Sequence, residues 1–328
     1  MENVKWKVDT VIDCHVHFDN VEPIPHFYDN IDLISSTKSA ILGLPPGNTS
    51  NQRILDLKKD RPEQFFIFGH LVHKPEFVEK GDGSYLAEQA ERFMAAGFDG
   101  IKMLEGKPTQ RVTYAPHPFD HEYYRPFWEY VTEHSIPVTL HLADSTFRWD
   151  HDRPDDAYCG GAPFEEYMRE GEAILETYPG LKISFAHFMF LSLWLDRLDD
   201  LFTRFPEMRV DLAMGSEYLY AISRDPEEGH DFFVKWQERI IYGTDLNDRN
   251  SSRLAHAKGE TIRRFLETDQ VFPSLTLAAQ DQEPKVIHGR SDFQGLNLPI
   301  EVLENILHRN FEKFAGKKPK SVPPDASI

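Results

Sequence analysis

The sequence VIDCHVHF, residues 11–18, decides how the rest of the chain is interpreted. Side chains of a β-strand alternate between its two faces, so this spacing predicts Asp13, His15 and His17 on one face. The opposite face carries Ile12, Cys14, Val16 and Phe18 and suits packing against helices, which argues against Cys14 as a metal ligand. Two imidazoles near the end of one strand can reach the same metal ion. A pair of structural histidines explains this short pattern equally well.

Seven further apolar runs with the length of a buried strand follow the first. They are residues 39–44, 65–72, 100–104, 136–142, 181–188, 210–214 and 239–243, and most are bounded by Gly, Pro, Asp or Asn. Amphipathic patterns separate them, including residues 85–96, 126–134, 164–178 and 191–205. Strands that alternate with helices form a parallel sheet, and eight such units close into a barrel. We therefore predict an α/β fold, a (β/α)8 TIM barrel.

An open, doubly wound sheet is the alternative architecture. It predicts a glycine-rich phosphate-binding loop after an early strand. The sequence contains neither GxGxxG nor GxxxxGK followed by Ser or Thr, which favours the barrel.

The whole chain, residues 1–328, is interpreted as a single domain with a core of about residues 8–316. Two segments exceed normal loop length and are expected to be functional or disordered. They follow the fifth and eighth strands, as residues 144–164 and 246–273, and the second turns helical at residues 261–266. Residues 299–314 predict a C-terminal helix, and residues 317–328 a disordered tail.

Composition restricts the class of partner. The formal net charge of −18 argues against nucleic acid and anionic membrane surfaces, whereas a small-molecule substrate remains compatible. No apolar run approaches the roughly 20 residues of a membrane span, and the first residues lack the apolar region of a signal peptide. Two cysteines, Cys14 and Cys159, make no disulfide framework. A cytoplasmic location is the expectation, and a homo-oligomer is compatible with the sequence.

Polar residues recur where later strands are expected to end. His141 ends the fifth run, His187 the sixth and Asp245 follows the eighth, while Lys102 lies in the fourth. In a closed barrel the carboxyl ends of the strands converge on one mouth. Nitrogen and carboxylate ligands without thiolate suit Zn²⁺ first, and Mn²⁺ or Fe²⁺ as alternatives. The pattern therefore predicts a divalent metal site at the mouth, with chance placement as the alternative.

These residues resemble the amidohydrolase superfamily, and within it the amidohydrolase-related branch also called amidohydrolase family 2. The matching segments are residues 13–17, 100–102, 138–141, 185–188, 241–245 and 305–311. They occur in the right order over nearly the whole chain. The resemblance is specific for the superfamily and weak for the substrate.

The resemblance implies a set of site residues. The metal ligands would be His15, His17, His141 and Asp245. His187 would lie beside the metal and polarise the substrate or assist proton transfer. In binuclear relatives a carboxylated lysine bridges two metals, and here that residue would be Lys102. One metal is favoured over two, in which case Lys102 is an ammonium group behind the ligands or at the substrate.

The expected reaction is hydrolysis of an amide, ester or lactone bond in a small carboxylate-bearing substrate by a metal-activated water. Asp245 would be both ligand and general base, and His187 would stabilise the oxyanion. Non-oxidative decarboxylation of an aromatic or unsaturated carboxylic acid is the alternative reaction, since the branch contains such enzymes. A metal-binding barrel without catalysis is the third reading.

Substrate-binding residues are less well defined by the sequence. Arg111, after the fourth strand, and Arg148, in the loop after the fifth, can each clamp a carboxylate with two hydrogen bonds, or can be solvated surface charges. His70 and His73 follow the third strand and have a substrate contact or a structural role. Glu217, past the seventh run, is a candidate for the border of the pocket.

Overall fold

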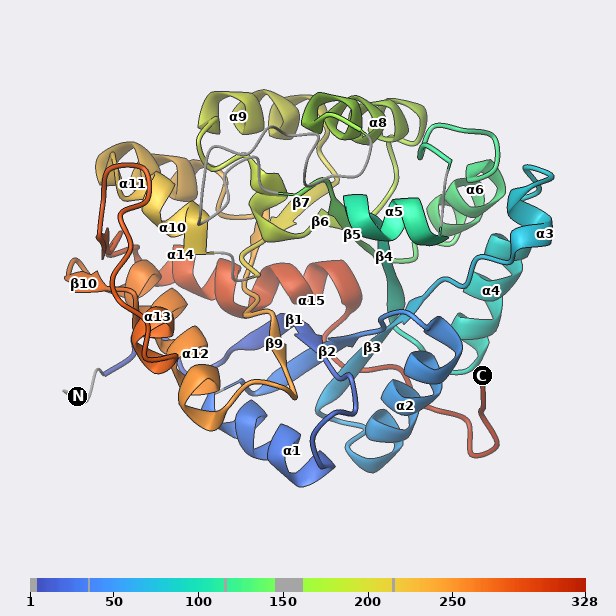
Figure 1. Ribbon diagram of the computed structural model, residues 1–328, viewed down its shortest axis with the longest axis horizontal. Coiled ribbons are helices and arrows are strands. Elements are labelled where there is room, and N and C mark those ends of the chain that lie inside the picture. The colour runs from blue at the N-terminus through green and yellow to red at the C-terminus, as the bar shows by residue number, and fades with distance from the viewer. Residues whose placement is uncertain (1–4, 35, 115–116, 145–161, 214–215) are drawn as a thin grey trace.

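The computed structural model of the chain describes residues 5–34, 36–114, 117–144, 162–213 and 216–328. Nine parallel strands form one sheet in the order β8-β7-β6-β5-β4-β3-β2-β1-β9. The strands are β1 (Ile12–His17), β2 (Lys38–Leu42), β3 (Phe65–His70), β4 (Gly100–Gly106), β5 (Val138–Leu142), β6 (Ile183–Phe185), β7 (Met208–Asp211), β8 (Ile240–Ile241) and β9 (Leu246–Asn247). Helices surround the curled sheet (Figure 1).

One chain segment closes this sheet into a barrel. β8 pairs with β7, and β9, which follows β8 closely in the chain, pairs with β1 at the other edge. Between them the Cys14 N–H donates to the Tyr242 carbonyl at 3.0 Å, and the Asp245 N–H donates to the His15 carbonyl at 2.9 Å. The predicted (β/α)8 barrel is confirmed, with an eighth strand that is interrupted before Asp245.

The helices that surround the sheet carry its main hydrophobic core. They are α1 (Ile24–Leu33), α2 (Gly47–Asp60), α3 (Pro75–Val78), α4 (Ser84–Ala95), α5 (Pro108–Tyr114), α6 (Arg125–Glu133), α8 (Phe164–Thr177), α9 (Leu195–Arg204), α10 (Ser216–Ile222), α11 (Pro226–Lys235), α12 (Ser252–Glu267) and α13 (Leu275–Ala279). As the spacing predicts, α4 buries Leu86, Ala90 and Phe93 on one side. Among the described residues, no helix is long and apolar enough to cross a membrane.

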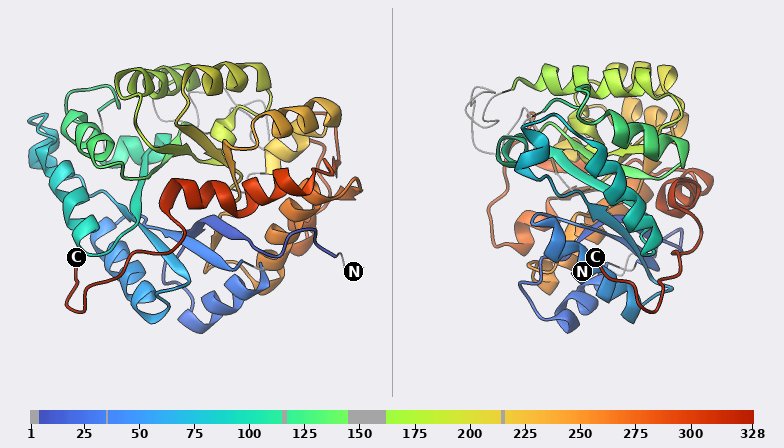
Figure 2. Two further views of the ribbon diagram at one scale, coloured as in Figure 1. Left: turned by 180° about the vertical axis from the view of Figure 1, so that it is seen from behind. Right: turned by 90° about the vertical axis from the view of Figure 1, so that its right-hand side faces the viewer.

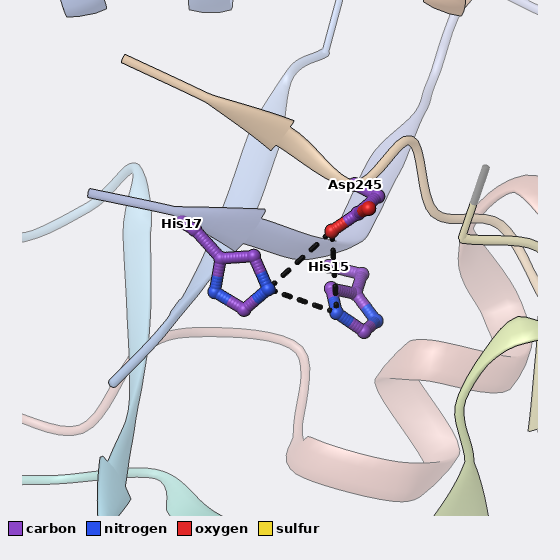
Figure 3. Close-up of side chains that lie close together, drawn as sticks. All are labelled: His15, His17 and Asp245. Carbon is purple, nitrogen blue, oxygen red and sulfur yellow. Dashed lines mark hydrogen bonds and ion pairs between the residues drawn. The ribbon is translucent and has the colours of Figure 1, made fainter. Parts of the chain in front are cut away.

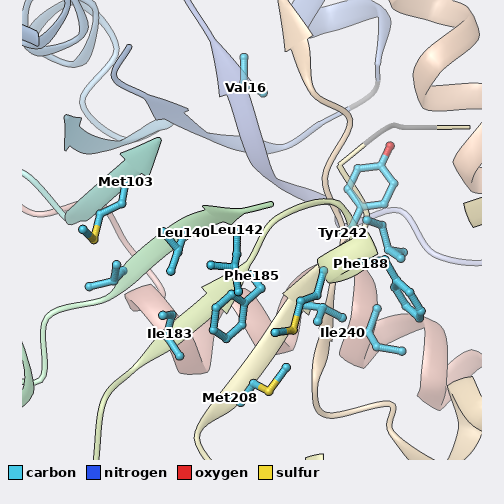
Figure 4. Close-up of a cluster of buried hydrophobic side chains, with 14 of the residues drawn as sticks. Val16, Met103, Leu140, Leu142, Ile183, Phe185, Phe188, Met208, Ile240 and Tyr242 are labelled. Atoms are coloured by element: carbon cyan, nitrogen blue, oxygen red, sulfur yellow. The ribbon is translucent and has the colours of Figure 1, made fainter. Parts of the chain in front are cut away.

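Outward-facing strand residues meet these helices. Met103, Leu140 and Phe185 are fully buried there, and Figure 4 shows part of this layer. Burial of such side chains stabilises the fold by about 1.5–3 kcal/mol each, before the entropy cost of ordering them. The layer holds the strands rigidly, which fixes the positions of the side chains at their carboxyl ends.

The C-terminal helices close one end of the barrel. α14 (Ile300–Glu304), the π-helical turn η2 (Asn305–Arg309) and α15 (Asn310–Ala315) form one continuous rod, seen in front in the rear view of Figure 2. Phe311 meets Phe66 of β3 edge to face, with ring centroids 4.9 Å apart. Together with Phe68 and Phe314 these rings form a second apolar cluster inside the barrel. The predicted C-terminal helix is therefore present, and its aromatic side chains close this end of the barrel interior.

Two expectations about irregular segments are wrong. Residues 246–273 are not a long loop, because α12 begins at Ser252 and not near residue 261. Its start is capped by the Ser251 hydroxyl, which accepts from the Leu254 N–H at 3.3 Å. A short antiparallel pair, β10 (Val271–Pro273) with β11 (Asp292–Gln294), ends the segment. The loop after the fifth strand falls mostly on residues 145–161, outside the described residues.

Residues 317–328, expected to form a disordered tail, instead lie against the barrel. The Lys320 N–H donates to the buried carboxylate of Asp99 at 2.7 Å, and the Ile328 N–H donates to Gln52 at 3.0 Å. Val322 and Ala326 pack against the core. These contacts supply backbone partners that the sequence pattern does not reveal.

Candidate metal centre

His15, His17 and Asp245 converge at the carboxyl end of β1 (Figure 3). The two Nε2 atoms of the histidines are 3.1 Å apart. An Asp245 carboxylate oxygen, Oδ1, lies 3.4 Å from the His17 Nε2 and 3.7 Å from the His15 Nε2. Within the described part of the chain, these three residues are the one group of His, Cys, Asp or Glu side chains with the spacing of metal ligands.

The hydrogen bonds on the far side of each ring fix its tautomer. The His15 Nδ1–H donates to the Asp211 carboxylate at 2.8 Å, and the His17 Nδ1–H donates to the Leu42 carbonyl at 3.1 Å. Each Nε2 therefore presents a lone pair toward the other, and burial holds the pKa of His15 well below its usual value. Two facing lone pairs repel unless a cation lies between them. This arrangement fits a divalent metal ion.

Asp211 belongs to the candidate site, although the sequence patterns did not indicate it. It ends β7, is fully buried and accepts from three donors: the His15 Nδ1–H, the His187 N–H at 2.9 Å and the Ala213 N–H at 3.0 Å. Burial raises the pKa of Asp211, and His187 and Lys102 oppose that shift. The sequence does contain one signal for this role. Asp211 is the only carboxylate in the apolar run of residues 210–214, and a buried acid needs a hydrogen-bond or charge partner.

His141 and His187 form a second pair beside the first. The His187 Nδ1–H donates to the Ala213 carbonyl at 3.3 Å, so the His187 Nε2 accepts from the His141 Nδ1–H at 3.2 Å. The His141 Nε2 is then left buried, with no partner among the described residues. The ring centroids of His187 and His15 are 5.2 Å apart. His141 lies outside the three-residue group, yet it offers an unused lone pair next to it.

Lys102 lies behind the candidate metal centre, inside the barrel. It is fully buried and its Nζ is 3.4 Å from the His15 Nε2. Burial lowers the pKa of Lys102 to about 8, against the opposing charges of Asp211 and Asp245. This position is adjacent to the predicted ligands and is compatible with either role expected for the lysine.

Asp245 is ionised and held in an unusual backbone conformation. Burial raises the pKa of Asp245, but the positive charge of Lys258 opposes burial, and the pKa lies well below the usual value. Its φ of 54° lies in the left-handed region, which Asp and Asn tolerate better than most residues. The Lys258 ammonium donates to the Asp245 carbonyl at 2.5 Å. The carboxylate is thus available as an anionic ligand and proton acceptor.

The expected face pattern of β1 is wrong for two residues. A register shift against β2 between Asp13 and Val16 interrupts the simple alternation. The Asp13 carboxylate accepts from the Thr244 N–H at 3.0 Å and the Thr244 hydroxyl at 2.5 Å, so it braces the segment before Asp245. Ile12 and Cys14, both expected to face outward, lie in the apolar cluster inside the barrel.

Arg111, expected as a substrate clamp, is committed to the protein interior. Its guanidinium is buried, donates to Glu170 at 2.6 Å and lies between the rings of Phe119 and Tyr167 at 4.7 Å and 4.6 Å. A guanidinium held in this way has little freedom to bind a substrate carboxylate. Arg148 and the side chain of Glu217 lie outside the described residues.

Two further histidines are also bound within the protein: His70, which ends β3, and His73, which follows it. His73 contacts the Glu105 carboxylate at 2.7 Å and the Tyr123 hydroxyl at 2.9 Å. The His70 Nδ1–H donates weakly to the Lys102 carbonyl at 3.4 Å, and Asn51 holds the His70 backbone. Both residues support the structure around β4.

Comparisons with known proteins agree with this fold. The sequence model of a family described as Amidohydrolase matches residues 12–314. No curated protein matches the chain. One similar structure is 5-carboxyvanillate decarboxylase from Sphingomonas paucimobilis, with 12% identity, 94% of this chain and 99% of that chain covered and a TM-score of 0.57.

Two other similar structures are described as hydrolases. A probable 2-pyrone-4,6-dicarboxylic acid hydrolase from Acinetobacter baumannii has 12% identity and a TM-score of 0.54, with 94% and 99% of the two chains covered. An amidohydrolase from Burkholderia multivorans with bound Zn has 10% identity and a TM-score of 0.55, with 96% and 100% covered. At these identities the similarity establishes the fold alone.

Proposed function

The chain belongs to the amidohydrolase family, and from this premise we propose that it is a metal-dependent hydrolase. The proposed substrate is a small carboxylate-bearing molecule with an amide, ester or lactone bond. The observation that carries the proposal is the pair of facing Nε2 lone pairs of His15 and His17, 3.1 Å apart, beside the ionised Asp245.

The residues that would hold the metal are His15, His17 and Asp245, with His141 as the fourth ligand through its unpartnered Nε2. Nitrogen and carboxylate donors without thiolate suit Zn²⁺, and the zinc bound to the Burkholderia protein supports this choice. A bound divalent ion would polarise a substrate oxygen and lower the pKa of a water molecule. We propose one ion, with Lys102 as an ammonium group behind it.

Asp245 is the proposed general base. Its carboxylate is ionised, and its side chain, about one-third exposed, can accept a proton from water and deliver it to the leaving group.

His187 fits proton transfer better than oxyanion stabilisation. Its Nδ1–H is occupied by the Ala213 carbonyl, so the neutral ring has no free N–H for an oxyanion. Its basic Nε2 accepts from the His141 Nδ1–H and can take up a proton when that hydrogen bond opens. We therefore replace the oxyanion role expected from the sequence with proton transfer at the His187 Nε2.

The direct test is Asp245→Asn, assayed against a panel of lactones, amides and esters. Asn tolerates the left-handed φ, so the fold should persist while kcat/KM falls by about 10²–10⁴. The exposed Asp269→Asn is the matched control and should keep wild-type turnover. Wild-type activity in Asp245→Asn would remove this residue from the mechanism.

Decarboxylation of an aromatic or unsaturated acid is the second candidate. It is supported by the fold similarity to 5-carboxyvanillate decarboxylase. The TM-score for that protein, 0.57, is about the same as the 0.54 for the pyrone hydrolase. Incubating the metal-loaded protein with aromatic acids and lactones in ¹⁸O-water separates the two. Release of carbon dioxide favours decarboxylation, and a new acid that contains ¹⁸O favours hydrolysis.

A further inference from the structure

The turn η1 (His187–Phe190), directly after β6, has a rare backbone conformation. Its four residues have φ values of 57°, 56°, 53° and 55°, all in the left-handed region, and none is glycine. Left-handed helical conformation costs an L-residue energy because the Cβ crowds the following carbonyl oxygen. Such strain persists where the surrounding structure enforces it, and it concentrates at functional sites.

Two side chains of the turn lie in the hydrophobic core, and the other two lie beside the candidate metal centre. Phe188 and Met189 are fully buried, and the Phe188 ring stacks on Phe233 with centroids 5.8 Å apart and an interplanar angle of 9° (Figure 4 shows Phe188 among core side chains). These two residues anchor the turn to the helix layer. The other two, His187 and Phe190, are partly exposed.

His187 and Phe190 lie together because residues three apart share one side of a 3₁₀ turn. Their rings are 5.4 Å apart with an interplanar angle of 29°, which is a stacked arrangement. The Phe190 ring also lies 5.5 Å from the ring of His141. Phe190 is therefore an apolar, partly exposed ring held against the two histidines beside the candidate metal centre.

We propose that Phe190 is a specificity-determining residue that forms one wall of the substrate pocket and selects flat, conjugated carboxylic acids over saturated ones. This inference rests on the proposed function, because it places the substrate beside His141 and His187. An aromatic ring favours another flat π-system through offset or edge contacts, beyond the area that it buries. The core anchors Phe188 and Met189 preorganise the wall, so little conformational entropy is lost on binding.

The test compares the dissociation constants of benzoate and cyclohexanecarboxylate for the zinc-loaded protein by NMR titration. The wild type should prefer benzoate by roughly 2- to 12-fold, the range of aromatic pair couplings. Phe190→Leu keeps an apolar side chain without a π-face and should bring the ratio close to unity. The same substitution at Phe77, a partly exposed ring of α3 that stacks on Tyr85, should keep the wild-type ratio.

Thermal unfolding checks that each variant is folded, and Phe190→Met replaces Phe190→Leu if the latter is not. An unchanged benzoate preference in the folded variant would overturn the inference, as would a wild type that binds both acids equally or binds neither. The ratio needs no turnover. A protein that binds zinc and prefers benzoate but hydrolyses nothing would refute the proposed function and leave the role of Phe190 standing.

Discussion

Hydrogen-bond acceptors at the Nδ1 atoms of His15 and His17 set the orientation of both rings in the candidate centre. His15 and His17 each donate one ring proton away from the centre, to Asp211 and to the Leu42 carbonyl, and so direct their lone pairs inward. Such partners fix both the tautomer and the orientation of a metal-binding imidazole. The chemistry of the site therefore depends on residues that would not contact the metal.

Asp211→Asn should weaken zinc binding by about 10- to 100-fold, because the His15 Nδ1–H loses its charged acceptor. Competition with a chromophoric chelator measures the affinity. Exposed Asp231→Asn serves as the control and should bind zinc like the wild type. Equal zinc affinities for Asp211→Asn and wild type would show that Asp211 does not orient His15.

Glu105 makes stability depend on acid pH. Burial raises its pKa, but the His73 hydrogen bond and charge outweigh burial, so the folded pKa lies below the usual value of 4.5. A group with a depressed pKa stabilises the folded state above its unfolded pKa and loses that contribution as the pH falls through the folded pKa.

Glu105→Gln should therefore destabilise the protein by about 1–3 kcal/mol near neutral pH, where it removes a charged acceptor from a buried donor. The difference from wild type should shrink once the pH is well below 4.5. Urea unfolding of both proteins over a pH series measures it. A difference that is constant with pH would contradict the assigned ion pair.

Elements defined by long apolar patterns could be predicted from the sequence, because buried strands and amphipathic helices leave a periodic signal. β3 begins at Phe65 and α8 at Phe164, as expected.

His15, His17 and Asp245 were found because the carboxyl ends of barrel strands meet. A register shift or a left-handed turn leaves no periodic signal, so the inward position of Cys14 and the contacts of Phe190 with His141 and His187 could not be predicted.

The C-terminal rod is the element whose packing is most open to test. Phe311 is almost fully buried against the aromatic rings of β3. Its replacement by Ala removes the contact with Phe66 and leaves a cavity at this end of the barrel. Phe311→Ala should lower the free energy of unfolding by about 3–5 kcal/mol. Denaturant unfolding measures the change.

Ile300→Ala is the control in the same rod, because Ile300 is 56% exposed and should change stability by no more than about 0.5 kcal/mol. Equal effects of the two substitutions would show that the rod does not seal the barrel.

The whole molecule combines a barrel closed by residues 240–247 with a tail that crosses its outer side. The tail contributes one donor to Asp99, which also accepts from the Lys58 ammonium at 2.6 Å and the Ile67 N–H at 2.8 Å. The tail thus supplies a hydrogen-bond donor to a buried carboxylate that lies away from the candidate metal centre. Stability and metal binding are therefore expected to respond separately to its removal.

Truncation after Gly316 should reduce the free energy of unfolding by about 1.5–3 kcal/mol, since the Asp99 carboxylate loses a hydrogen bond. Zinc stoichiometry should stay unchanged. Chemical denaturation and elemental analysis of the truncated protein check the two statements. Loss of bound zinc in a folded truncated protein would show that the tail supports the centre after all.

The central claim is that His15, His17 and Asp245 hold a divalent metal ion. Elemental analysis of the purified protein, alongside the double variant His15→Ala/His17→Ala, tests it most directly. We predict one divalent ion per chain in the wild type, with zinc as the ion, and none in the double variant when that variant remains folded. A folded wild type that contains no divalent metal and takes up none from added zinc would contradict the account.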